Sequence, residues 1–176
     1  MTNEYRLLSL KNRFGIKDLK GLVELKSALM EVNNMVTYEI TKKAIEWLYN
    51  KIGGFDLQVA LDSLNNQSMN ANGYDIELPD IVAEVKCNIP ETDFTYGSSQ
   101  KSRIREDIKG LTNGKVKSKK NPKEHYKFLF LLNCPGAEEA LAKMKLYKSY
   151  NNVVVLDENI TQSYSKDLIY IVFIGE

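Results

Sequence analysis

Two acids and a lysine stand close together in the most regularly patterned part of the chain. Asp75 precedes a turn signal at Pro79-Asp80, and Glu84 and Lys86 follow it. We expect residues 74–88 to form a hairpin, because side chains on both sides of this turn alternate between apolar and polar. Counting outwards from a two-residue turn pairs Asp75 with Glu84, which would place their Cβ atoms about 5 Å apart.

The polar face of this hairpin has the residue types of a metal site. Two carboxylates at that distance repel each other unless a proton or a cation lies between them. Carboxylates are ligands that Mg²⁺ and Mn²⁺ prefer, and the main-chain carbonyl of Val85 would supply a third oxygen. Lys86 projects from the same face as Glu84, where its ammonium would orient a water or stabilise charge on a phosphate. This pattern predicts phosphodiester hydrolysis; the alternative is an ordinary surface hairpin with a Glu–Lys pair.

The charge distribution indicates a polyanionic partner for the segment that follows. The net charge is +1, yet residues 101–127 carry ten Lys or Arg and three Asp or Glu, a local +7 that leaves −6 elsewhere. Lys101, Arg105 and Lys109 share one stripe of the helix expected there, which would follow a phosphate backbone. The alternative is a solvated lysine-rich surface. A basic loop comes next and would add phosphate contacts through Lys115, Lys117, Lys119 and Lys120.

Asp75 followed by Glu84-Val85-Lys86 resembles the signature of the PD-(D/E)xK nuclease superfamily, which includes type II restriction endonucleases and Holliday-junction resolvases. The resemblance implies that Asp75 and Glu84 are metal ligands and that Lys86 is the catalytic lysine. It departs from the usual form in two respects. Tyr74 rather than proline precedes the aspartate, and the Pro-Asp pair that does occur, Pro79-Asp80, lies too close to Glu84 to supply the family's aspartate. In this superfamily a helix after the catalytic strand flanks the site, which implies substrate contacts from Gln100 or Lys101.

The remaining elements must position this hairpin. Apolar spacing predicts helices over 17–33 and 38–51, separated at Asn33-Asn34, and further helices near 100–111 and 137–148. Strands are expected over 55–61, 126–132, 153–156 and 168–174, with a polar loop over 65–73. This order predicts a three-layer α/β fold with a mixed central β-sheet flanked by helices, and the resemblance implies the restriction-endonuclease-like version of it.

Length and composition predict one domain. The chain has 176 residues, of which 43% are hydrophobic, so it can bury a core. We divide it into an N-terminal helical extension (1–35), a catalytic core (36–134) and a C-terminal part (135–176) that completes the sheet. The sequence has no run of eighteen apolar residues that would span a membrane, no secretion signal, and only two cysteines, so we expect a reduced, cytoplasmic compartment.

These features predict an endonuclease that hydrolyses DNA phosphodiester bonds with Mg²⁺ or Mn²⁺, in the manner of a type II restriction enzyme. The expected partner is DNA, with no membrane and no small-molecule cofactor. A homodimer stays open, because residues 1–35 exceed what a minimal nuclease core needs. The first alternative is a nuclease-fold DNA-binding or regulatory subunit that does not cut by itself. The second is an interaction protein in which the acid pair has no chemical role.

Overall fold

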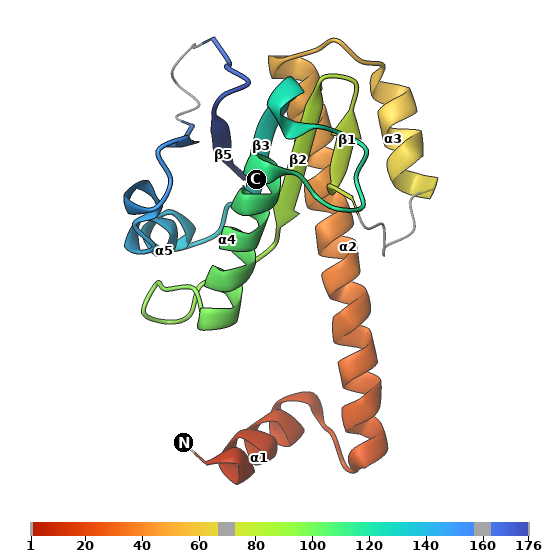
Figure 1. Ribbon diagram of the computed structural model, residues 1–176. Coiled ribbons are helices and arrows are strands. Elements are labelled where there is room, and N and C mark those ends of the chain that lie inside the picture. The colour runs from red at the N-terminus through yellow and green to blue at the C-terminus, as the bar shows by residue number, and fades with distance from the viewer. Residues whose placement is uncertain (1, 67–72, 157–162, 176) are drawn as a thin grey trace. The chain divides into compact units, whose positions relative to one another are not determined.

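A computed structural model describes residues 2–66, 73–156 and 163–175, and Figure 1 shows its elements. Most of the loop expected over 65–73 lies outside these residues. The helices are α1 (Asn3–Phe14), α2 (Leu19–Lys51), α3 (Leu57–Asn66), α4 (Ser98–Asn113) and α5 (Ala137–Lys143), with short 3₁₀ turns at Pro122–Glu124 and Leu146–Lys148. The strands are β1 (Ile76–Leu78), β2 (Ile81–Lys86), β3 (Tyr126–Leu132), β4 (Val153–Val155) and β5 (Ile169–Ile174). The chain divides into two compact units, Met1–Val36 and Thr37–Glu176.

The first unit contains α1 and the first part of α2. The Oγ1 of Thr2 accepts a hydrogen bond from the Tyr5 amide and caps α1, which ends at Gly15 in the left-handed conformation. Two predicted helices are in fact one, because α2 continues through Asn33-Asn34. Asparagine lowers helix stability by only about 0.7 kcal/mol relative to alanine, which the surrounding turns offset.

The strand predicted over 55–61 is wrong, since this segment begins helix α3. The Asp56 carboxylate accepts a hydrogen bond from the Val59 amide and starts the helix. Ala60 is buried, and Leu57, Leu61 and Leu64 pack against the same core. These positions follow a spacing of three and four, so the helical period outweighs the short alternation that suggested a strand.

The second unit is built around a mixed five-stranded sheet with strand order β1-β2-β3-β5-β4. β1 is antiparallel to β2, and the other neighbours are parallel. The hairpin register is confirmed at its three ladder pairs, Ile76 with Ala83, Glu77 with Val82 and Leu78 with Ile81. The sheet therefore brings the start of β1 beside the carboxyl end of β2.

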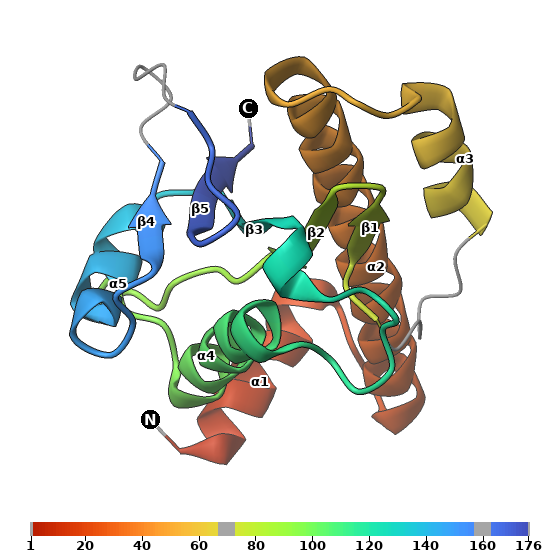
Figure 2. The ribbon, with the colours of Figure 1, turned by 45° about the horizontal axis from the view of Figure 1, so that its top comes forward.

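Helices cover both faces of this sheet, which makes the second unit a three-layer α/β fold (Figure 2). On one face, Ala44 and Leu48 of α2 pack with Phe128 and Phe130 of β3. On the other face, α4 and α5 pack over Val82, Leu129 and Ile171. Strict alternation along 74–88 would put Tyr74 on the same face as Ile76, and this expectation is wrong. Tyr74 packs on the α4 side, because the regular alternation of β1 begins only at Ile76.

Among the helices of the described residues, none combines the length and the apolar character needed to cross a membrane.

Candidate active site

The hairpin brings Asp75 to the side of Glu84 through a main-chain contact. Asp75 directly precedes β1, and its Oδ2 accepts a 2.8 Å hydrogen bond from the Val85 amide. Since the N–H and C=O of one strand residue point to the same side, the Val85 carbonyl also faces this edge of β2. The Asp75 carboxylate is partly exposed, whereas Glu84 is 1% exposed. One open and one buried carboxylate thus lie next to each other.

Lys86 is the point on which the acids converge. Its Nζ lies 3.7 Å from Asp75 Oδ2, 3.8 Å from Glu84 Oε2 and 3.0 Å from Asp107 Oδ2. It also donates a 3.2 Å hydrogen bond to the carbonyl oxygen of Val85. The structure therefore brings together the groups that the sequence singled out on the hairpin: Asp75, Glu84 and the Val85 carbonyl lie around the ammonium of Lys86.

Asp107 was not singled out in the sequence, although it completes the cluster. It lies in α4 between Ile104 and Ile108, both fully buried, and is itself 8% exposed. The signal was present, because positions 104, 107, 108 and 111 follow the spacing of the buried stripe of a helix. An acid at such a position is costly to bury unless a partner meets it.

Lys115 brings a second ammonium to the cluster. Its Nζ forms an ion pair with Glu84 Oε1, donates a 3.1 Å hydrogen bond to the carbonyl of Gly73, and lies 5.5 Å from the ring centre of Tyr74. Gly114 makes this return possible, since its φ of 95° lets the chain leave α4 and turn back over the hairpin. Lys115, expected as a phosphate contact, is paired with a candidate metal ligand.

The electrostatics of the cluster follow from burial. Burial, and then the neighbouring Asp75 carboxylate, raise the pKa of Glu84 to about 8, although Lys115 acts in the opposite direction. Burial also raises the pKa of Asp107, against the lowering effect of Lys86. Burial alone would lower the pKa of Lys86, but Asp75, Asp107 and Glu84 together raise it. Three carboxylates and two ammonium groups leave an excess negative charge, which favours uptake of a proton or a cation.

The composition of the cluster limits what metal it could hold. Across residues 2–66, 73–156 and 163–175, no three His, Cys, Asp or Glu side chains are arranged to share one metal ion. The partly exposed carboxylate of Asp75, the buried carboxylate of Glu84 and the main-chain carbonyl of Val85 all lie beside Lys86. Such a set suits a hard cation that keeps several waters, as Mg²⁺ does.

The other expected nucleic-acid contacts fall into two groups. Gln100 and Lys120 bind main-chain groups: Gln100 accepts from the Gly97 amide at 2.9 Å and donates to the Ile89 carbonyl, and Lys120 donates to the carbonyls of Leu78 and Pro79. They tie α4 and the basic loop to their neighbours. The second group lies at the surface, half-exposed or exposed, and consists of Lys101, Arg105, Lys117 and Lys119.

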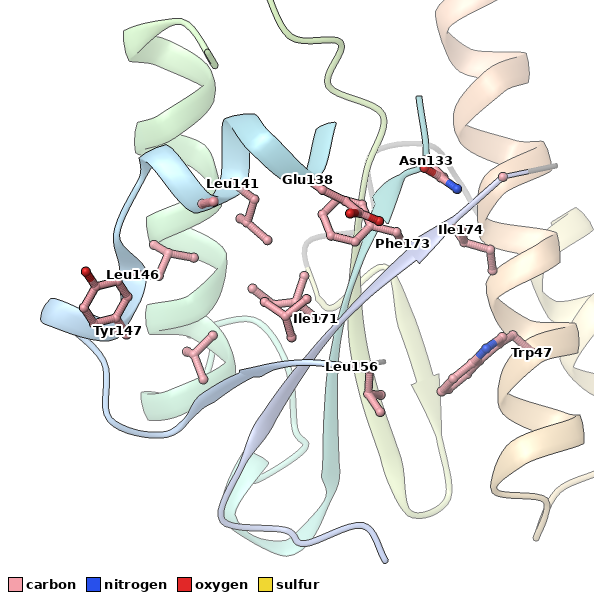
Figure 3. A pocket seen from close by; sticks show the side chains of 14 residues that line it. Trp47, Asn133, Glu138, Leu141, Leu146, Tyr147, Leu156, Ile171, Phe173 and Ile174 are labelled. Carbon is pink, nitrogen blue, oxygen red and sulfur yellow. The ribbon is translucent and has the colours of Figure 1, made fainter. Parts of the chain in front are cut away.

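A large cavity lies apart from this cluster. It has a volume of about 1000 Å³ and is mostly apolar, with Trp47, Leu141 and Phe173 among its lining residues (Figure 3). None of the candidate site residues lines it. A smaller cavity of about 380 Å³ is lined by Asp75 and Lys117, among others. Size favours the first cavity, but the convergence of titratable groups identifies the acid–lysine cluster as the candidate site.

Comparisons with protein-family models, with curated proteins and with solved structures find no match to this chain.

Proposed function

We propose that this protein is a metal-dependent endonuclease that hydrolyses phosphodiester bonds in DNA. The observation that carries the proposal is the position of the Lys86 ammonium, 3.7 Å from the Asp75 carboxylate and 3.8 Å from the Glu84 carboxylate. The order of these residues along the chain also resembles the PD-(D/E)xK nucleases. The three-layer α/β architecture with a mixed sheet is compatible with that family's fold.

We expect Mg²⁺ or Mn²⁺ to bind at the oxygens beside Lys86. Asp75, Glu84 and the Val85 carbonyl would hold it, and the excess negative charge of the cluster favours its uptake. Such an ion, when bound, supplies neutralisation of the phosphate and activation of a water. Lys86, beside both carboxylates, would orient that water and stabilise the charge that develops on the phosphate.

Basic side chains at the surface near the cluster would hold the DNA backbone. Lys117 lines the same cavity as Asp75, so a phosphate bound there would lie near the proposed metal ligands. Lys101 and Arg105 are half-exposed on α4, the helix that carries Asp107. Binding through such contacts is independent of base sequence and weakens steeply with salt.

The first unit offers a surface for a second copy of the chain. Within α2, apolar residues recur with alternating steps of three and four, the spacing by which two helices pair in a coiled coil. The positions are Leu22, Leu25, Leu29, Val32 and Val36. Leu29 and Val32 are more than half exposed. A second copy carries the same spacing, and two copies would give the two sites needed to cut both strands of a duplex.

Incubation of supercoiled plasmid and of single-stranded DNA with Mg²⁺ or Mn²⁺ tests the proposed function. We expect nicking by the wild-type chain that EDTA abolishes. Lys86→Ala and Glu84→Gln should reduce the rate at least about 100-fold, because each removes a group that acts on the phosphate or the metal. Glu138→Gln is the matched control for Glu84→Gln, since Glu138 is an exposed acid outside the cluster.

Two results would contradict nuclease activity at this site. Nicking that survives both Lys86→Ala and Glu84→Gln would place any activity elsewhere. Salt-sensitive DNA binding without cleavage, under every metal condition, would instead support a DNA-binding or regulatory subunit. Thermal unfolding of each variant separates loss of activity from loss of folding.

A further inference from the structure

Asp107 makes the shortest of the three ion pairs of Lys86. The Nζ–Oδ2 distance is 3.0 Å, against 3.7 Å to Asp75 and 3.8 Å to Glu84. Asp107 belongs to α4, whereas the other two acids belong to the hairpin segment. The position of the Lys86 ammonium therefore depends on α4, a helix that is joined to β2 by a loop.

Among the residues that the structure describes, Lys86 is the one cation within ion-pair distance of Asp107, and Lys115 acts on it from farther away. Ile104, Ile108 and Leu111 of the same helix are fully buried against the sheet, so Asp107 stands in an otherwise apolar stripe. Burying a carboxylate is unfavourable unless a charged or hydrogen-bonding partner meets it. A leucine at this position would pack the helix without that cost, so packing alone does not explain an acid here.

We infer that Asp107 is a positioning residue, which holds the ammonium of Lys86 beside the two proposed metal ligands. This inference rests on the proposed function, in which Lys86 acts on the water and the phosphate. The long, flexible side chain of a lysine has many rotamers, and an anchor on a buried helix selects the one that reaches the reacting atoms. Asp107 is 8% exposed and forms an ion pair with Lys86, so it acts through Lys86 rather than on substrate.

The main test compares Asp107→Asn with wild type in single-turnover DNA cleavage. The substitution keeps the shape of the side chain and removes its charge. We expect the maximal cleavage rate to fall about tenfold or more, while the dissociation constants for DNA, measured with Ca²⁺ in place of Mg²⁺, and for Mn²⁺ change less than about twofold. Asp107→Glu, which keeps the charge, should recover part of the rate. Glu106→Gln is the matched control, because Glu106 is exposed on the same helix.

A double-mutant cycle supplies a readout that needs no activity. Thermal unfolding of the full chain is measured for Asp107→Asn, Lys86→Met and the double variant. We expect the two shifts in Tm to be clearly non-additive, since the two side chains contact each other. In cleavage, Asp107→Asn should cause no further loss in the Lys86→Met background.

The possible failures are distinguishable. A wild-type chain that never cleaves DNA would overturn the proposed function, and the thermal cycle would still decide whether Asp107 and Lys86 are coupled. Cleavage by Asp107→Asn at the wild-type rate would overturn the positioning role alone. Weaker Mn²⁺ binding, equal to that of Glu84→Gln, would show that Asp107 is a metal ligand and would also overturn it.

Discussion

At the scale of single residues, the burial of Glu84 is the feature with the most consequences. Its carboxylate is 1% exposed and lies beside Asp75, so both the loss of water and the like charge favour its protonated form. Lys115 offsets only part of this effect. The metal-free protein is therefore expected to hold a proton at Glu84 under conditions where an exposed glutamate would be ionised.

The first prediction concerns the pH dependence of stability in EDTA. The pKa of Glu84 is raised from its ordinary value of 4.5 to about 8, so between these values the folded state binds a proton that the unfolded state has lost. The free energy of unfolding should therefore decrease as the pH rises from about 5 to about 8. Glu84→Gln should remove this part of the decrease, as measured by urea unfolding at several pH values.

Glu138→Gln serves as the control, because Glu138 is an exposed glutamate of the same unit and the substitution should leave the slope of stability against pH unchanged. If the Glu84→Gln and wild-type slopes coincide over this range, Glu84 titrates as an ordinary carboxyl and the account of the cluster is wrong.

At the level of secondary structure, α4 and the loop after it add two charged side chains to the cluster that the hairpin forms. The helix carries Asp107 to Lys86, and the chain then turns at Gly114 so that Lys115 reaches Glu84. Lys120 holds the same loop to the hairpin tip through the carbonyls of Leu78 and Pro79. The connection between the parallel strands β2 and β3 thus supplies one acid, Asp107, and one lysine, Lys115, to the candidate site.

Lys115→Met provides a prediction at this scale. At the proposed metal site the Lys115 ammonium would compete with a divalent cation for Glu84, so its removal should tighten Mg²⁺ binding by the DNA-free protein by about threefold to tenfold, or roughly 0.7–1.4 kcal/mol. Loss of the Lys115 charge also favours protonation of Glu84, which opposes metal binding. A divalent ion carries twice the charge of a proton, however, so the more negative potential stabilises the bound ion more than it stabilises the bound proton. Isothermal titration calorimetry at pH 8.5 measures the change.

Lys119→Met is the control for this experiment, since Lys119 is an exposed lysine of the same loop and should leave the affinity for Mg²⁺ unchanged. An affinity that stays constant or weakens in Lys115→Met would show that Lys115 does not oppose metal binding at Glu84.

At the scale of the whole molecule, the two units differ in how well they bury their apolar residues. In the second unit the sheet has a packed layer on each face. In the first unit many large apolar side chains are exposed, among them Leu8, Leu19, Leu29, Met30 and Val32. Exposed apolar surface of this extent is typical of interaction sites, and on this ground we propose that a second copy of the chain covers it.

The prediction at this scale is self-association through α2. Leu29→Lys combined with Val32→Lys places two charges on the proposed seam and should shift the chain from dimer to monomer in sedimentation equilibrium at micromolar concentration. Ser27→Lys, an exposed polar position of the same helix, is the control and should stay dimeric. A wild-type chain that sediments as a monomer at all concentrations tested would refute the proposed dimer.

Features that depend on short-range geometry could be predicted from the residues alone. Side chains alternate strictly along a strand, so the register of Ile76–Leu78 with Ile81–Ala83 and the shared face of Glu84 and Lys86 followed from counting. The buried strand over 126–132 was equally clear from its apolar run. Short segments were harder, as α3 shows, because six or seven residues fit both periods and only the packing against the sheet selects one.

The distant residues that complete the candidate site could be identified only from the packed chain. Asp107 and Lys115 lie more than twenty residues from the hairpin acids, and no local period relates them to Glu84 or Lys86. Their positions depend on where the crossover from β2 to β3 lays α4 across the sheet, which is set by the fit of Ile104, Ile108 and Leu111 against the strands. The packing of apolar side chains thus determines where these charged groups lie, and the alternation of residues along a strand does not predict their positions.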